Sequence, residues 1–172
     1  GAEFRSDGVV ARQLFNTDAA QRSHTSRVFV NAEWTPSPRW TLNAGGTLES
    51  DALSGTHFAP RLVAHWKYRP DQTLRFGVSE AFRTPSLFEQ RSDWRFVFAG
   101  QTIDIRYLSR GGLPPERVRA AEVTWLAEFR DARLSVDARA FDERVTGLIT
   151  QQLYSLPPGT EFDPNSGAYD LR

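Results

Sequence analysis

Residues 58–69 read Phe-Ala-Pro-Arg-Leu-Val-Ala-His-Trp-Lys-Tyr-Arg, and in this stretch apolar side chains alternate with charged or polar ones. Leu62 and Trp66 fall on one face of an extended chain, whereas His65 and Lys67 fall on the opposite face. Successive side chains of a β-strand point to opposite sides of the sheet. The period of two therefore predicts a two-faced strand and not an amphipathic helix.

The same alternation recurs along most of the chain, and the apolar faces of the clear repeats carry no charged side chain. We therefore expect an all-β chain whose strands pair antiparallel as an up-and-down meander. A soluble sandwich also hides an apolar face, so alternation alone leaves that architecture open. The further clear repeats lie at 25–35, 39–49, 73–79, 121–130 and 133–141, and a weaker one at 2–14.

Short and long connections are expected to alternate between these strands. A meander gives this pattern when one rim has tight turns and the other has functional loops, as in outer-membrane barrels. The short connections are 36–38, 70–72 and 131–132, and the longer ones are about 15–24, 50–57, 81–117 and 156 onward.

Large aromatic residues gather beside the short connections, while the strand middles carry small residues such as Ala44 and Ala64. Aromatic rings at one level of an outward face form a belt at the boundary between hydrocarbon and water. This distribution favours a membrane barrel in contact with outer-membrane lipid over a sandwich. The predicted lipid-interface residues are Trp34, Trp40, Trp66, Tyr68 and Phe129.

The composition excludes several classes of protein. Lys plus Arg and Asp plus Glu are 21 each, which argues against a nucleic-acid binder. Cys is 0, so no disulfide or thiolate metal site is expected. No apolar run is long enough for a transmembrane helix, and no signal peptide is visible at the start of the chain.

No catalytic, cofactor-binding or metal-binding motif is present, so we expect that the protein is not an enzyme and predict no cofactor and no metal site. The chain lacks the His-Glu-x-x-His pattern, the Gly-x-Ser-x-Gly elbow, the phosphate loop and the dinucleotide fingerprint. His24 and His57 lie at or near the ends of long loops, where a haem ligand is conceivable.

Five segments, in order and with matching spacing, resemble the barrels of TonB-dependent outer-membrane receptors. The most characteristic is Gly-Val-Ser-Glu-Ala-Phe-Arg-Thr-Pro-Ser-Leu-Phe-Glu-Gln at 77–90. The others are Trp-Thr-Leu-Asn-Ala-Gly-Gly from 40, Pro-Arg-Leu-Val-Ala from 60, Leu-Pro-Pro-Glu-Arg from 113 with Ala-Glu-Val from 121, and Leu-Ser-Val-Asp-Ala-Arg-Ala-Phe-Asp-Glu-Arg-Val-Thr-Gly-Leu-Ile at 134–149.

The resemblance implies a segment of a large transmembrane β-barrel with about 22 strands and a plugged lumen. Residues 1–172 would be a partial barrel domain of about seven or eight strands, without the plug domain and the remaining strands. It further implies a receptor in the outer membrane of a Gram-negative bacterium that imports a scarce nutrient, most often a ferric siderophore. The TonB energy-coupling complex would act through the missing N-terminal part.

The 81–117 segment is too long for a simple turn, and binding residues concentrate in long loops. Guanidinium groups and flat rings suit an anionic, aromatic ferric siderophore; the alternative is a loop that packs only on its neighbours. The candidate ligand-binding residues are Arg83, Arg91, Trp94, Arg95, Tyr107 and Arg110. Strands at 95–98 and 102–106 are expected to form a hairpin about Gly100.

The resemblance implies a structural role for a second set of residues. They would lie in the barrel wall, mark the points where strands begin, or form hydrogen bonds in the lumen. These are Phe82, Arg83, Pro85, Glu116 and Glu122.

Two alternatives from other classes remain: a small self-contained barrel that carries a ligand, as lipocalins do, and an outer-membrane barrel enzyme. The enzyme would need a Ser, a His and an acid on the outward face, where the strands have neither His nor acid.

Overall fold

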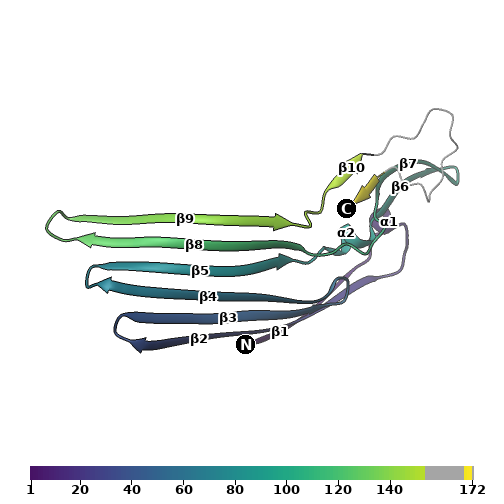
Figure 1. Ribbon diagram of the computed structural model, residues 1–172. Helices are drawn as coiled ribbons and strands as arrows, with labels where there is room; N and C mark the ends of the chain where they lie inside the picture. The colour runs from purple at the N-terminus through teal and green to yellow at the C-terminus, as the bar shows by residue number, and fades with distance from the viewer. Residues whose placement is uncertain (154–168, 172) are drawn as a thin grey trace.

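The computed structural model describes residues 1–153 and 169–171. Its main feature is a single antiparallel sheet in which each strand pairs with the next along the chain, except that two loop strands intervene between the fifth and sixth (Figure 1). This confirms the predicted all-β meander. In spatial order the strands are β1 (Ala2–Val9), β2 (Gln21–Ser37), β3 (Trp40–Asp51), β4 (Gly55–Arg69), β5 (Gln72–Arg83), β8 (Glu116–Phe129) and β9 (Leu134–Thr146).

The other elements gather at one end of this sheet (Figure 1). A second sheet has the order β10-β11-β7-β6, with the predicted hairpin about Gly100 as β6 and β7. Neither helix in the described part of the chain is long and apolar enough to cross a membrane. The bounds are α1 (Arg12–Phe15), α2 (Leu87–Arg91), β6 (Asp93–Phe98), β7 (Gln101–Leu108), β10 (Gln151–Leu153) and β11 (Tyr169–Leu171).

Cross-strand register keeps most of the apolar side chains on one face, with Phe29, Val63 and Leu126 on the other. Trp40 pairs with Trp66, Trp66 with Leu74, and Leu74 with Trp125, so one row of apolar residues crosses β3, β4, β5 and β8. Because the side-chain period is two, a slip of one residue in any pair would move a whole strand's apolar set to the polar face. The alternation seen in the sequence therefore fixes the register.

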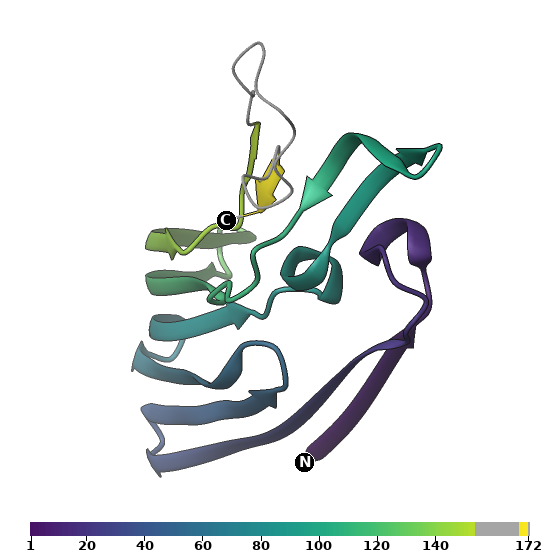
Figure 2. The ribbon, with the colours of Figure 1, turned by 90° about the vertical axis from the view of Figure 1, so that its right-hand side faces the viewer.

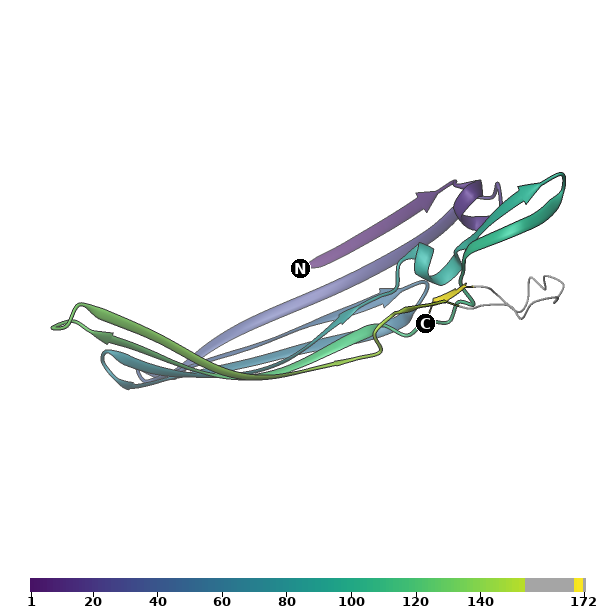
Figure 3. The ribbon, with the colours of Figure 1, turned by 90° about the horizontal axis from the view of Figure 1, so that it is seen from above.

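The apolar face is exposed, and no second layer formed by the described residues lies over it. Trp34 is 65% exposed, Val30 69% and Leu62 52%. Seen along the strands, the sheet curves, and α2 lies on its concave side (Figure 2), while the view from above shows a long, bent sheet with the loop elements at one end (Figure 3). A sandwich would bury these residues, so the described sheet has instead the form of a barrel wall.

Aromatic side chains near the tight turns touch one another on the exposed face. The rings of Trp40 and Trp66 stack with centroids 5.6 Å apart, and Tyr68 lies 5.7 Å from Trp66. The indole Nε1–H of Trp125 donates to the Tyr68 hydroxyl at 2.9 Å, and Phe129 contacts Trp125 edge-on. The structure thus joins residues of three strands in one row, whose role at a lipid interface stays a prediction.

The expected alternation of short and long connections is wrong at 50–57. β3 continues to Asp51 and β4 begins at Gly55, so the link is a turn at 52–54. The Asp51 carboxylate accepts hydrogen bonds from the backbone N–H groups of Leu53 and Ser54, and Gly55 takes a φ of +90°. An Asp that bonds the backbone two residues on makes a compact turn, and this chemistry was overlooked in the sequence.

The first long connection also differs from expectation. β1 ends at Val9 instead of reaching residue 14, α1 follows it, and β2 already begins at Gln21. Asn16 closes the helix in the left-handed region, with φ 51°, which an Asn tolerates better than most residues. The long segment expected from 156 onward lies mostly outside the described residues.

Candidate ligand-binding site

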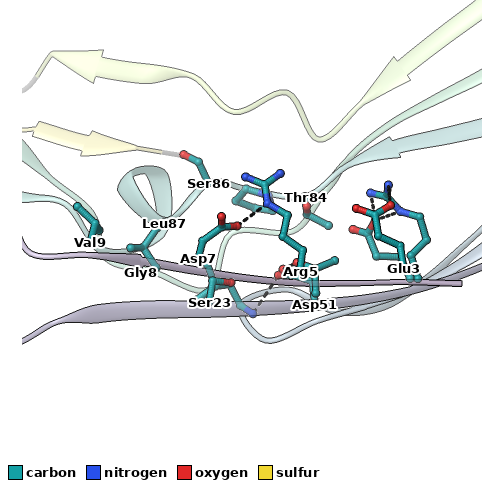
Figure 4. A pocket seen from close by; sticks show the side chains of 15 residues that line it. Glu3, Arg5, Asp7, Gly8, Val9, Ser23, Asp51, Thr84, Ser86 and Leu87 are labelled. Atoms are coloured by element: carbon teal, nitrogen blue, oxygen red, sulfur yellow. Dashed lines mark hydrogen bonds and ion pairs between the residues drawn. The ribbon is translucent and has the colours of Figure 1, made fainter.

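A polar cavity of about 510 Å³ opens on the concave face at the loop end of the sheet (Figure 4). The inward faces of β1, β2 and β3 form its wall, and the segment at 84–87, which leads into α2, lies across it. The polar lining includes Glu3, Arg5, Asp7, Ser23, Thr25, Arg27, Glu49, Asp51, Thr84 and Ser86.

Strand register places these polar groups side by side. Glu3 pairs with Arg27, and Arg27 pairs with Glu49, so one cation lies between two carboxylates on neighbouring strands. The Arg27 Nε donates to Glu49 at 2.8 Å, and its Nη1 donates to Glu3 at 3.3 Å. Two residues further along the same strand pair, the Thr25 hydroxyl donates to Asp51 at 3.0 Å.

Asp7 and Arg5 form a further ion pair at 2.7 Å (Figure 4). In total the lining carries four carboxylates and two guanidiniums. The surplus is negative, so this cavity suits hydroxyl, amide or cationic groups better than a bare anion. Sequence reasoning missed these residues. The alternation of Glu3, Arg5 and Asp7 on one face of a strand was the available signal.

Arg83, the last residue of β5, joins three separate parts of the chain beside this cavity. Its Nε donates to Glu116 at 2.6 Å, and its Nη1 and Nη2 donate to the two oxygens of Glu89 at 3.0 and 2.9 Å. Glu116 also accepts the backbone N–H of Ile149 at 2.9 Å. The hydrogen bond from Arg83, with that of Ile149, lowers the pKa of Glu116 to about 2.

Helix α2 holds the 84–87 segment over the cavity. Ser86 caps its first turn: the hydroxyl accepts from the Glu89 N–H at 3.2 Å, and the Glu89 carboxylate accepts from the Ser86 N–H at 2.7 Å. Gln90 is buried, and its amide donates to the Leu113 carbonyl at 2.9 Å and accepts the Leu113 N–H at 3.2 Å. The helix is thereby joined to the chain that leads back into β8.

None of the six predicted ligand-binding residues lines the cavity. Arg83 is paired as described, Arg91 donates to the Gln21 side chain at 3.1 Å, and Arg95 pairs with Asp93. These pairs lie within the loop and between the loop and its neighbours. Ligand binding by the 81–117 segment and packing on its neighbours therefore both stay predictions. Arg110 lies in the exposed part of the connection from β7 to β8.

Trp94 and Tyr107 are brought together by the β6–β7 hairpin. Their rings stack with centroids 5.6 Å apart at an interplanar angle of 21°, and Phe88 of α2 packs edge-on against Tyr107. Arg106 lies over the ring of Phe96 at 5.6 Å on the same hairpin. This aromatic cluster offers flat surfaces beside cationic groups, the chemistry expected for an aromatic anion.

The remaining family-motif residues lie in the wall. Glu122 bridges Arg75 at 3.1 Å and Arg139 at 2.6 Å across β5, β8 and β9 on the polar face. Gly77 leaves the room that Glu122 occupies, since a Cβ there would lie 2.9 Å from the Glu122 Cγ. Phe82 packs against His57 with centroids 5.3 Å apart, and Pro85 is buried where the chain leaves the sheet.

The two histidines considered as haem ligands are engaged in protein contacts. His57 bonds the Ser54 hydroxyl at 3.1 Å and lies 3.4 Å from an Arg117 nitrogen, while the ring of His24 stacks on Phe4. Among residues 1–153 and 169–171, no group of three or more His, Cys, Asp or Glu side chains is arranged to hold a metal ion. Haem ligation by either histidine thus gains no support from these contacts.

The profile of the TonB dependent receptor-like β-barrel matches residues 1–168. The chain belongs to the TonB-dependent receptor family. It is 36% identical, over 88 residues, to the iron-regulated outer membrane virulence protein of Vibrio cholerae, a match that covers 49% of this chain and 14% of that protein. Localisation in a Gram-negative outer membrane follows from membership of the TonB-dependent receptor family.

Two solved receptor structures show the same fold. The siderophore receptor PirA from Pseudomonas aeruginosa has a TM-score of 0.71 at 15% identity, with 88% of this chain and 28% of that one covered. A mutant of the ferric enterobactin receptor PfeA from the same organism has a TM-score of 0.74 at 16% identity, with coverage of 99% and 27%. The chain therefore spans about a quarter of these receptors.

Proposed function

We propose that residues 1–172 form part of the barrel of an outer-membrane receptor that imports a ferric siderophore, powered by the TonB system. The observation that carries this proposal is the polar concave face with its capped cavity, in a chain of TonB-dependent receptor fold. The names of the relatives support it, because PirA is described as a siderophore receptor, PfeA as a ferric enterobactin receptor and the Vibrio cholerae protein as iron-regulated.

The open edges of the sheet support a larger barrel. β1 and β9 each pair on one side only among the described strands, and lipid does not tolerate unpaired backbone groups. Further strands of the receptor would pair with both edges. A plug domain would fill the lumen against the inward charges, such as Glu122 and its two arginines. A lipocalin-like carrier or an eight-stranded barrel enzyme would instead close on itself, which the described strands do not do.

Ligand capture is divided between two places in this proposal. The β6–β7 hairpin offers the Trp94–Tyr107 stack, with Arg95 and Arg106 on the same strands, to the aromatic and anionic parts of the ligand. The cavity below offers carboxylates and hydroxyls, which suit the ligand's hydrogen-bond donors. The receptor moves its ligand unchanged, and its chemistry is binding rather than catalysis.

Uptake of radioactive iron by cells that produce the full-length receptor tests the proposal. Cells that lack the receptor are expected to lose uptake of one ferric siderophore from a panel of catecholates and hydroxamates, and cells that lack the TonB system to lose it as well. If the receptor takes up haem or cobalamin and none of the siderophores, the proposed ligand class is wrong. If uptake does not depend on TonB, the proposed mechanism is wrong.

The double variant Trp94→Ala/Tyr107→Ala tests where capture occurs. Loss of one stacking surface costs about 1–3 kcal/mol in comparable aromatic contacts, so we expect binding of the siderophore to weaken by about tenfold or more. Trp34→Ala removes a ring of the same kind from the outward face and is the matched control, expected to bind normally. Equal binding by both variants would contradict capture at the hairpin.

A further inference from the structure

The outward face of the sheet is apolar from the aromatic row near the tight turns toward the loop end. On β5, β8 and β9 this apolar surface stops before the loop end. Arg119 pairs with Glu80 on one side and with Arg144 on the other, and all three stand on the face that also carries Val78 and Val123. At the same level, β2, β3 and β4 carry Val30, Gly46 and Pro60 instead. One sector of the outer wall is thus charged where the neighbouring sector is apolar, and the expectation that the outward face has no acid is wrong at Glu80 and Asp142.

The height of this charged sector decides what it contacts. Arg119 lies six residues from Trp125, which is about 20 Å along a strand. With a strand tilt of about 40°, the rise is about 15 Å, less than the apolar band of about 25 Å on such barrels. A guanidinium at this depth faces the lipid, so it needs a polar partner at the same level.

The charges within the sector do not balance. Glu80 accepts from Arg117 and from Arg119, at 2.5 and 2.8 Å, and Asp142 pairs with Arg144 at 3.5 Å. Three guanidiniums therefore meet two carboxylates, and the side chains of Arg119 and Arg144 remain 74% and 81% exposed. The surplus is positive and points outward, so the sector complements an anion.

An apolar groove of about 550 Å³ runs directly below the arginines on the same outward face. Small side chains on β8 and β9 form its floor, and Asp142, the partner of Arg144, lines it beside Ala121. A further recess lined by Glu80 and Arg119 shares Leu62 and Val78 with it. The groove is therefore continuous with the charged sector. Its apolar lining consists mainly of Leu62, Phe76, Val78, Ala121, Val123 and Ala140.

We infer that this part of the outer wall binds a phosphate-bearing membrane lipid, with one acyl chain in the groove and the phosphate between Arg119 and Arg144. The groove sets the position of the chain, and the surplus guanidinium charge selects an anionic headgroup over a zwitterionic one. Basic side chains beside an anionic headgroup attract it even when they are partly paired with protein carboxylates. The inference depends on the membrane face of the barrel and not on the identity of the imported ligand.

Native mass spectrometry of the full-length receptor, released from nanodiscs of phosphatidylglycerol mixed with phosphatidylcholine, tests the inference. The unmodified receptor is expected to retain phosphatidylglycerol in preference. Arg119→Gln/Arg144→Gln should reduce that preference by about fivefold for each guanidinium removed. Arg130→Gln/Arg133→Gln, in the β8–β9 turn at the opposite rim, removes the same charge and should leave the preference unchanged.

A second variant keeps the charges and fills the groove. Ala121→Phe places a ring where the acyl chain would lie, and we expect it to lower retention of phosphatidylglycerol with Arg119 and Arg144 intact. Soluble glycerol phosphate in excess should not displace the retained lipid. The inference is overturned if the turn variants reduce the preference as much as the sector variants do, if Ala121→Phe has no effect, or if glycerol phosphate displaces the lipid.

Discussion

At the scale of single residues, one guanidinium links the wall of the receptor to its loops. Arg83 binds Glu116 at the start of β8 and both oxygens of Glu89 in α2. This geometry uses the planar fork of an arginine, which a lysine ammonium cannot reproduce. The arrangement explains the position of this residue in the motif at 77–90 without assigning it a contact with the ligand.

Arg83→Lys is therefore expected to loosen the loop while the charge is kept. Lysine reaches one carboxylate at a time, so hydrogen exchange of the backbone in 84–92 should accelerate by about tenfold, in line with the loss of about one charge-assisted hydrogen bond. The measurement is exchange mass spectrometry of the full-length receptor. Arg91→Lys, which retains its single bond to Gln21, is the control, and equal exchange in both variants would contradict the role of Arg83.

Glu116 gives a pH dependence to the same junction. Its pKa falls from 4.5 to about 2 because the folded state stabilises the carboxylate, so the stabilisation is fully present above pH 4.5 and is lost as the pH falls toward 2. Protection of the Ile149 amide, corrected for intrinsic exchange, should decline across this window. In Glu116→Gln the decline should be absent, and a decline of the same size there would show another titrating group.

At the scale of elements, a buried amide joins α2 to the chain that leads into β8. Gln90 satisfies both the N–H and the C=O of Leu113, so Gln90→Leu leaves two backbone groups without these partners. Each unsatisfied buried group costs about 1–3 kcal/mol. We expect faster hydrogen exchange in both 87–91 and 111–115 and, under the proposed function, weaker binding of the siderophore. Exchange confined to the helix would show that Leu113 is held by other contacts.

At the scale of the whole molecule, one curved sheet separates a lipid-facing surface from a polar interior. Ala32 and Asn31 are neighbours on β2 whose side chains point to opposite faces. Ala32→Arg should destabilise the folded receptor in lipid by about 2–4 kcal/mol, whereas Asn31→Arg should have little effect. Denaturant titration in vesicles measures both. Equal destabilisation would mean that the outward face is not in lipid.

The sequence predicted the strands well because alternation is a local property of an extended chain. Leu62 and Trp66 share a face whatever the neighbouring strands do, and the hairpin about Gly100 follows from the few residues around its turn. The turn at 52–54 was missed because Asp51 acts through hydrogen bonds to the backbone that spacing does not reveal. Composition and motif order together were also enough to indicate the receptor family.

The cavity could not be predicted in this way. Its wall joins Glu3 to Glu49 through two strand registers, and its cover, at 84–87, comes from a distant part of the chain. The amino-acid sequence by itself thus determined which side of each strand is apolar, because that depends only on residues two positions apart in the chain. Only the tertiary structure decided which charges meet across strands and which arginines are already paired, because those contacts depend on how strands and loops close in space.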